Sequence, residues 1–397
     1  MRVVICPDKF AGTLTAVEAA QAIAEGWRSV APGDELVLRP VADGGPGFLE
    51  VLHTSLGGDL IEVPTTDPLG RVVTGSVLIV GDTAYLESAQ ATGLHHLAPG
   101  ERDPKITTSA GLGALVAAAT AQGAHKLIIG LGGSATNDGG AGFLAALGFK
   151  PLDREGNPLP PGGAVLRRAA ALTLPTSAAP APPAAITTIL PARGVGGAAA
   201  GQRWVELVGA SDVDNPLVGE QGATAVYGPQ KGASAADVVL LDAALANWAA
   251  VLQRDLPGCP QDLAALKGAG AAGGLGAAVL ALGGRIVSGI DLILTETGLG
   301  EAVAEAGVVI TGEGSFDHQS LRGKVIAGVA GAARDHGVPC VVLAGRVTTG
   351  RREQGAAGIT EAHSLVDHFG DVDLAMTAPA RGLRELSARM AGQYSRR

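Results

Sequence analysis

The stretch LIIGLGGSATNDGGAG, residues 127–142, changes from the pattern of a buried strand to that of an anion-binding loop within a few residues. Its apolar start is typical of a parallel strand, and the apolar run 143–147 that follows predicts a helix. In an α/β protein this corner lies at the carboxyl edge of the sheet, where backbone N–H groups and the helix dipole favour anions. The stretch therefore predicts an α/β fold with a phosphate-binding loop.

Polar side chains in this loop extend the prediction from anion binding to chemistry. Gly132, Gly133 and Ser134 are the expected phosphate contacts, because glycine lets the backbone approach a phosphate closely. Asn137 would orient a phosphate or a substrate, and Asp138 would bind Mg²⁺ or accept a proton during phosphoryl transfer. On this interpretation, replacing Asp138 with Asn lowers kcat far more than it lowers stability. The alternative is that Asn137 or Asp138 only caps the following helix, which needs one of them.

The length and composition of the chain limit the classes of protein to which it can belong. With 397 residues it is long enough for two domains, since a single core rarely grows beyond about 250 to 300 residues. The net charge of −9 argues against nucleic acids and anionic membranes as partners, because both attract basic surfaces. Cys6, Cys259 and Cys340 lack metal-ligand spacing, which predicts free thiols in a reducing compartment. The chain begins with a strand pattern rather than a signal peptide, and no apolar run reaches 18 residues, so a cytoplasmic protein is expected.

Several secondary-structure elements are predicted by pattern. Thr15 and Glu18 form a capping box, which predicts a helix from there to about Val30. Apolar runs predict central strands at residues 3–6, 36–38, 127–131, 205–210, 308–311 and 341–344. The segments 72–80 and 83–87 predict a β-hairpin.

Acidic residues follow five of the expected strands. They are Asp8, Asp43, Asp138, Asp212 with Asp214, and Glu313 with Asp317. Each could be a cap or a turn residue, and the adjacent Asp8 and Lys9 could form a simple strand-end ion pair. Core packing does not explain five such placements, however. Acidic groups that converge with glycine loops favour a site for Mg²⁺ and a polyphosphate.

The segment GEGSFDHQSLRGK, residues 312–324, adds cations to this pattern. Its candidate nucleotide-binding residues are Gly312, Glu313, Asp317, Arg322 and Lys324. Arg322 and Lys324 precede a predicted helix, where the dipole disfavours cations unless an anion is near, and a triphosphate would supply that anion. Glu313 and Asp317 could hold a second Mg²⁺ or the ribose hydroxyls, and the sequence leaves both roles open.

Two other classes of protein remain open on these residues. One is a nicotinamide-dependent hydroxy-acid dehydrogenase, because residues 130–135 match G-x-G-x-x-A after a strand and Asp153 lies near the position of an acidic ribose ligand. Residues 268–273 match G-x-G-x-x-G, although such matches are frequent in a chain with 60 glycines. The other is a non-catalytic sensor of a small acid. The chain lacks a Walker A motif, protein-kinase motifs and a G-x-S-x-G elbow.

Seven sequence blocks, in one order from residue 7 to about residue 345, resemble the bacterial type I glycerate kinase family. They are PDKFAGTLTA, VADGG, IIGLGGSATNDGGAG, SDVDNPLVGEQGA, GPQKGA, GAGAAGGLGA and TGEGSFDHQSLRGK. The resemblance implies ATP-dependent phosphorylation of D-glycerate, generally to 2-phosphoglycerate. We expect ATP, glycerate and Mg²⁺ to meet in a cleft between two lobes. The sequence leaves open which hydroxyl reacts and whether the protein is a homodimer.

The resemblance also implies two α/β domains, one of them assembled from both chain ends around an inserted second one. The predicted hairpin breaks the preceding βαβ pattern, which agrees with a domain crossing near Asp67. We expect residues 1–66 and 290–397 to form a Rossmann-like or flavodoxin-like parallel-sheet lobe. Residues 67–289 would form an inserted α/β lobe with the glycine-rich phosphate loops. The Pro-, Ala- and Gly-rich segment 172–201 is expected to be a surface loop.

Within this scheme, the acidic residues receive provisional roles. Asp8, Lys9 and Asp43 would line the side where glycerate lies, and Asp138 and Asp214 would bind Mg²⁺ or act as the general base.

Two positions depart from the family pattern, in which many relatives have Lys where this chain has Ala11 and Glu where it has Pro46. If that Lys grips a phosphate or the glycerate carboxylate, Lys9 must take its place here, or the choice of substrate differs.

Overall fold

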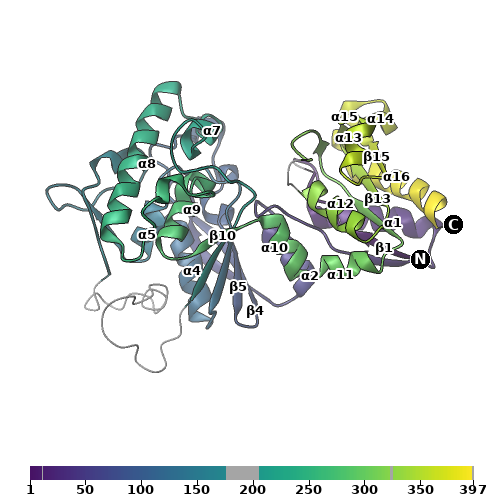
Figure 1. The fold of residues 1–397 in the computed structure, drawn as a ribbon, viewed down its shortest axis with the longest axis horizontal. Helices are drawn as coiled ribbons and strands as arrows, with labels where there is room; N and C mark the ends of the chain where they lie inside the picture. Colours follow the sequence, from purple (N-terminus) through teal and green to yellow (C-terminus); the bar gives the residue numbers. More distant parts are fainter. Residues whose placement is uncertain (11, 176–204, 322–324, 396–397) are drawn as a thin grey trace. The chain divides into compact units, whose positions relative to one another are not determined.

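The computed structural model describes residues 1–10, 12–175, 205–321 and 325–395, and the chain divides into two compact units (Figure 1). The unit that we call the terminal lobe comprises Met1–Asp43, Glu50–Gly57 and Gly289–Arg397, and the inserted lobe comprises Gly44–Leu49 and Gly58–Ser288. Each lobe has its own sheet and helices, which confirms the predicted α/β class with one lobe built from both chain ends. Ala11, Arg322, Lys324 and most of the segment 172–201 lie outside the described residues.

The sheet of the terminal lobe is fully parallel. Its strands are β1 (Arg2–Ile5), β2 (Glu35–Leu38), β11 (Val308–Thr311), β13 (Cys340–Ala344) and β15 (Glu361–Ser364), in the order β15-β13-β11-β1-β2. This is the strand order of a flavodoxin-like sheet, in which the chain changes direction between β1 and β11. Loops that leave the carboxyl ends of these two strands separate there, and ligands of such sheets bind in the opening.

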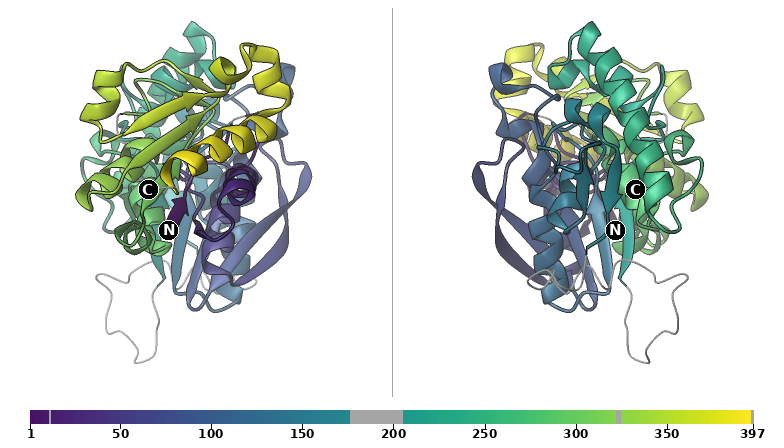
Figure 2. Two further views of the ribbon diagram at one scale, coloured as in Figure 1. Left: turned by 90° about the vertical axis from the view of Figure 1, so that its right-hand side faces the viewer. Right: turned by 90° about the vertical axis from the view of Figure 1, so that its left-hand side faces the viewer.

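Helix α1 (Ala16–Val30) forms where the capping box predicts it. The Thr15 hydroxyl accepts from the Glu18 N–H, and the Glu18 carboxylate accepts from the Thr15 N–H. Helix α16 (Pro379–Tyr394) packs along α1, as Figure 2 shows, and the Ser387 hydroxyl donates to the Ile23 carbonyl over 2.6 Å. Alternate residues of β1, β11 and β13 pack into the core under these two helices, together with the fully buried Trp27. The start and the end of the chain therefore share one core.

Further helices complete the terminal lobe, and α2 (Phe48–Leu56) contains residues of both units. The others are α10 (Gly289–Glu296), α11 (Leu299–Ala304), α12 (Val325–Asp335), α13 (Arg351–Ala356), α14 (Leu365–Phe369) and α15 (Val372–Thr377). A short parallel pair, β12 (Ser315–Phe316) and β14 (Arg346–Val347), extends the loops that follow β11 and β13.

The sheet of the inserted lobe is mixed. Its strands are β3 (Asp59–Thr66), β4 (Val72–Val80), β5 (Thr83–Glu87), β6 (Lys126–Gly130), β9 (Glu206–Ala210) and β10 (Arg285–Val287), in the order β10-β9-β6-β5-β4-β3. The predicted hairpin is confirmed, because β4 and β5 pair antiparallel. Strand β3 pairs with β4 along its whole length, so the structure groups residues 59–66 with the inserted lobe, whereas the sequence placed them in the terminal one.

Helices cover this mixed sheet and bury a large apolar core. They are α3 (Ala89–Thr92), α4 (Gly111–Ala121), α5 (Ala141–Ala146), α7 (Ala223–Tyr227), α8 (Ala235–Asp255) and α9 (Ala271–Ala281), and a small antiparallel pair joins β7 (Lys150–Leu152) to β8 (Ala171–Thr173). By length and composition alone, α8 could cross a membrane. Its residues Leu241, Leu245 and Trp248 are fully buried, however, as in the core helix of a globular domain.

Candidate functional site

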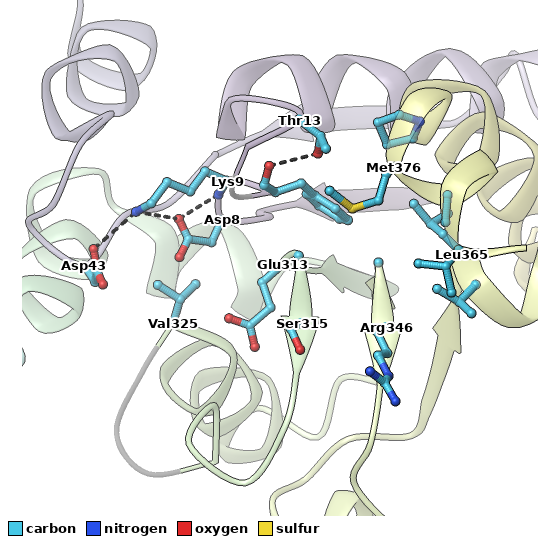
Figure 3. Close-up of a pocket in the computed structure, with 17 residues that line it drawn as sticks. Asp8, Lys9, Thr13, Asp43, Glu313, Ser315, Val325, Arg346, Leu365 and Met376 are labelled. Carbon is cyan, nitrogen blue, oxygen red and sulfur yellow. Dashed lines mark hydrogen bonds and ion pairs between the residues drawn. The ribbon is translucent and has the colours of Figure 1, made fainter. Parts of the chain in front are cut away.

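A cavity of the terminal lobe opens at the change of direction between β1 and β11. It has a volume of about 480 Å³ and is lined by residues that follow β1, β2, β11 and β13 and by helices α14 and α15. We call it the Asp8 cavity. Asp8, Lys9 and Asp43 lie at one end of it, and Leu365 and Met376 lie at the other (Figure 3). One end is therefore charged and the other apolar, which suits a ligand of mixed character.

Asp8, Lys9 and Asp43 form a linked charged group in this cavity. The Lys9 Nζ lies 3.5 Å from the Asp43 carboxylate and 3.8 Å from that of Asp8 (Figure 3). The backbone N–H of Asp8 donates a hydrogen bond of 2.8 Å to the Gly312 carbonyl, which fixes the backbone at this position. The Asp8 carboxylate accepts a hydrogen bond of 2.7 Å from the Lys9 N–H. The lysine is thus held between two carboxylates at the cavity wall, where the sequence placed a substrate contact.

The loop after β11 supplies the next part of the wall. Glu313 lines the Asp8 cavity together with Ser315 and Arg346. Gly312 lies against β13, where a Cβ atom would be 1.9 Å from the Leu343 carbonyl oxygen, so this close approach requires glycine. Asp317 is not among the lining residues. Its carboxylate accepts from the Gln319 and Ser320 N–H groups in a turn.

A second cavity lies in the inserted lobe beside the loop after β6. It has a volume of about 240 Å³ and is lined by Gly132, Gly133 and Ser134 of the predicted phosphate loop. Lys231, which comes much later in the sequence, also lines it, and so do residues 272–273 at the start of α9. We call it the Lys231 cavity. The Lys231 cavity is thus lined in part by residues from three separate stretches of the sequence, 127–142, 227–232 and 268–277.

Lys231 is almost fully buried, with 3% of its surface exposed. Its ammonium group donates to the Ser134 hydroxyl over 3.0 Å and to the Thr136 carbonyl over 2.7 Å. Burial lowers the pKa of this lysine to about 7, and the charge of Asp138 opposes that shift. A lysine that titrates near neutral pH beside a glycine loop is typical of a functional site.

Asp138 lies behind the loop and has 1% of its surface exposed. Its Oδ2 accepts from the Ser109 N–H at 2.8 Å, the Ser109 hydroxyl at 2.9 Å and the Gly142 N–H at 3.1 Å. Its Oδ1 accepts from the Gly140 N–H at 3.1 Å. Burial raises the pKa of Asp138, and these donors oppose the rise. The Gly140 and Gly142 N–H groups lie at the start of α5, as in the capping role that the sequence left as the alternative, whereas Ser109 belongs to another segment.

Asn137 is also fully buried. Its amide group donates to the Thr224 hydroxyl over 2.9 Å, which ties the loop to α7. Its Oδ1 has no hydrogen-bond partner among the described residues. The side chain therefore links two segments of the inserted lobe, and its orienting role stays a prediction.

The acidic residues after β9 are separated from this buried network. The Asp214 side chain is 80% exposed and lies 3.8 Å from the Lys267 ammonium group, and Asp212 accepts from the Ser288 hydroxyl over 2.8 Å. Within the ranges that the structure describes, no three His, Cys, Asp or Glu residues are grouped so that they alone could hold a metal ion. Mg²⁺ is usually held by one or two carboxylates together with water and the phosphates of a substrate, so it does not require such a group.

Gly273 allows the loops of the Lys231 cavity to pack closely. It has a φ of +69°, and a Cβ atom there would be 1.9 Å from the Thr136 carbonyl oxygen. We expect Gly273→Ala to lower the free energy of unfolding by about 3 kcal/mol, from the left-handed backbone and the clash together. Gly156 is the matched control, because its φ is +81° with no atom within 4 Å of such a Cβ. Chemical denaturation should show a much smaller loss for Gly156→Ala, and equal losses would contradict the packing argument.

The sequence predicts no role for two charged residues that line these cavities, Arg346 and Lys231. Arg346 follows β13 in the same way that Asp8 and Lys9 follow β1, so its place after a strand is the same kind of signal. Lys231 stands in a turn, GPQKGA, where an exposed lysine is the ordinary expectation. Its burial depends on Ser134 and Thr136, nearly a hundred residues earlier in the chain, and no local pattern reveals that.

Comparison with known proteins extends these observations to the whole chain. Residues 3–395 match the family model described as the glycerate kinase family. The chain is 41% identical to a glycerate kinase of Bacillus subtilis (strain 168), over 92% of this chain and 90% of the relative. It is 38% identical to the glycerate 2-kinase of Escherichia coli (strain K12), over 98% of each. A crystal structure from Salmonella typhimurium LT2, provisionally named glycerate kinase 2, is similar at a TM-score of 0.80 and 34% identity and covers 100% of this chain and 98% of that one.

Proposed function

Because this chain belongs to the glycerate kinase family, we propose that it transfers the γ-phosphoryl group of ATP to D-glycerate, with 2-phosphoglycerate as the favoured product. The names of the Bacillus subtilis and Escherichia coli relatives support the substrate, and the latter supports the position of transfer. The observation in this chain that carries the proposal is the charged end of the Asp8 cavity, where Lys9 lies between two carboxylates. A small hydroxy acid offers one carboxylate and neighbouring hydroxyls, which match such a set of groups.

In this proposal, the residues of the Asp8 cavity hold and orient glycerate. Lys9 binds the glycerate carboxylate as a point charge. Asp8 or Asp43 accepts a hydrogen bond from the attacking hydroxyl and takes its proton as the phosphoryl group is transferred. Because the transition state of phosphoryl transfer is loose, positioning the hydroxyl contributes more than removing its proton does.

The phosphates of ATP are assigned to the glycine loop of the inserted lobe. Gly132 and Gly133 leave room for a phosphate against the backbone, and the Ser134 hydroxyl lines the same hollow. On the terminal lobe, Gly312 and Glu313 stay proposed nucleotide contacts because Glu313 lines the Asp8 cavity. The proposed contacts of Asp317, Arg322 and Lys324 rest on the sequence alone.

Mg²⁺ would neutralise charge on the transferring phosphates, and the fit of the carboxylates differs between the lobes. Asp138 does not fit, because both of its oxygens already accept hydrogen bonds inside the protein. Asp8 and Asp43 do fit, since their carboxylates line an open cavity and Mg²⁺ needs only one or two carboxylates beside phosphate oxygens and water. Asp214 is exposed enough to bind an ion, but within the described part of the chain it belongs to no group of three His, Cys, Asp or Glu residues that could hold one.

The rival hypothesis of a nicotinamide-dependent dehydrogenase expects Asp153 to bind the ribose, and the contacts of Asp153 in this structure argue against that role. The Asp153 carboxylate accepts from the Glu155 and Asn157 N–H groups and pairs with Arg168 at 3.1 Å, so it closes a turn. The three cysteines are buried free thiols, which supports the proposed cytoplasmic location.

The direct test of the proposal is a coupled assay for ADP release with ATP, Mg²⁺ and D-glycerate, with L-glycerate and other small hydroxy acids as controls. We expect turnover with D-glycerate, and phosphorus NMR of the product should show the phosphate on the C2 hydroxyl. A phosphate on the C3 hydroxyl would overturn the favoured product but keep the kinase. Tight NAD binding without ADP release from any of these acids would overturn the kinase itself.

A further inference from the structure

Lys231 stands out because its ammonium group is buried and, among the described residues, has no carboxylate within ion-pair distance. Both acceptors of its ammonium group, the Ser134 hydroxyl and the Thr136 carbonyl, are neutral. No ion pair of Lys231 occurs in the part of the chain that the structure describes, and Asp138 acts on it only through space. A buried ammonium group that lacks a counter-ion is costly, and two neutral acceptors do not offset its lost hydration. A bound anion would supply the missing counter-charge.

The Lys231 cavity offers a place for that anion. Gly132 and Gly133 give bare backbone on one wall, and Ser134 carries the hydroxyl that Lys231 holds. Ala272 lies on another wall with a φ of 52°, and it is the one non-glycine residue with a positive φ among the described residues. Backbone strain of this kind is kept where the surrounding structure holds a functional site in shape.

We propose that Lys231 is the counter-ion of a phosphoryl group bound in the Lys231 cavity, so that this hollow holds the phosphate end of the nucleotide. The inference rests on the proposed function, since ATP supplies the phosphoryl group. An ammonium group has three donors, and two are used by Ser134 and Thr136. The third donates to a phosphate oxygen, and the phosphate then supplies the negative charge that Lys231 otherwise lacks.

This arrangement links nucleotide binding to proton uptake. Without ligand, burial keeps the pKa of Lys231 at about 7, so the group is mostly neutral at pH 8 and mostly charged at pH 6. A bound phosphoryl group favours the charged form and raises that pKa. Among the described residues, Asp138 is the charge that acts on Lys231, Arg102 packs against the adjacent Gly232, and Tyr227 lines the same cavity. Burial raises the pKa of Tyr227 above its usual value near 10, so the phenol stays neutral across this range. Binding at pH 8 must therefore take up a proton, and binding at pH 6 must not.

Titration calorimetry of the full chain with MgATP, without glycerate, tests this in two buffers of different ionisation enthalpy. For the wild type we expect uptake of close to one proton per site at pH 8 and nearly none at pH 6. Lys231→Gln keeps donors for Ser134 and Thr136 but has no charge, so it should lose the uptake and bind MgATP roughly 10 to 100 times more weakly. Lys150→Gln removes an exposed lysine of the same lobe and should behave like the wild type.

Unchanged affinity and unchanged proton uptake in Lys231→Gln would overturn the inference. A parallel titration with D-glycerate separates the sources of the anion, because weakened glycerate binding with normal MgATP binding would assign the cavity to a carboxylate instead. If Lys231→Gln does not fold, the wild type alone decides, since uptake that does not differ between pH 6 and pH 8 contradicts the mechanism. Normal MgATP binding with proton uptake but no glycerate turnover would remove the proposed function and leave this inference standing.

Discussion

Replacing Asp138 with Ala is expected to lower the free energy of unfolding by about 5 kcal/mol. The carboxylate accepts from Ser109 twice and from Gly140 and Gly142 once each, and all of these groups are buried. Each buried donor left without an acceptor costs about 1 to 3 kcal/mol, and alanine also leaves a small void. Urea denaturation followed by circular dichroism measures the loss directly.

Asp138→Asn separates the structural role from the catalytic one. An amide keeps one acceptor but turns a donor toward groups that already donate, so we expect it to lose about half of the stability that Asp138→Ala loses. The sequence predicts instead a large fall in kcat with little change in stability. A variant with full stability and greatly reduced kcat at saturating ATP and glycerate would therefore refute the capping interpretation. Asp214→Asn, which alters an exposed carboxylate of the same lobe, is the control for stability.

Lys9→Met is expected to lower kcat/KM for D-glycerate by about 100 to 1000 times, the usual effect of removing one preorganised charge from an active site. The substitution removes the proposed partner of the glycerate carboxylate. It also leaves Asp8 and Asp43 without the cation that lies between them, which disfavours an anionic substrate. The KM for ATP should change much less, because the phosphates are assigned to the inserted lobe. Steady-state kinetics with each substrate varied in turn provide the measurement.

Two further variants make this second prediction specific. Lys9→Arg keeps the charge and should recover part of the activity, whereas Arg28→Met removes an exposed cation of α1 and should have no effect. If Lys9→Met retains kcat/KM within about twofold, Lys9 forms only the strand-end ion pair that the sequence left as its alternative.

The parts of the fold that local chemistry determines could be predicted from the sequence. The capping box places the start of α1, and a run of three apolar residues followed by a β-branched threonine, VVIT, gives the limits of β11. Strand β15 could not be found in this way, because its sequence, EAHS, has no apolar run and becomes a strand only by pairing with β13. Short edge strands of this kind are determined by tertiary contacts.

The candidate site likewise has some features that local sequence predicts and others that depend on tertiary contacts. The position of Asp8 at a strand end follows from the sequence, and so does the glycine loop after β6. The direction of the Asp138 side chain does not, because it depends on Ser109, which lies 29 residues earlier in the chain. The burial of Lys231 likewise depends on residues 95 and 97 positions away. Local patterns indicate where chemistry can occur, and long-range packing decides which side chains take part.

The shared core of α1 and α16 imposes an order on biosynthesis. The sheet of the inserted lobe has all its strands once β10 has left the ribosome, at Val287. Strand β1 can pair early with β2, but its other neighbour, β11, begins only at Val308. The α1 face that carries Trp27 is not covered until α16 has been translated. The nascent chain therefore carries an incomplete terminal lobe through most of its synthesis, and a ribosome that stalls before α16 leaves the earliest helix as the part most exposed to chaperones and proteases.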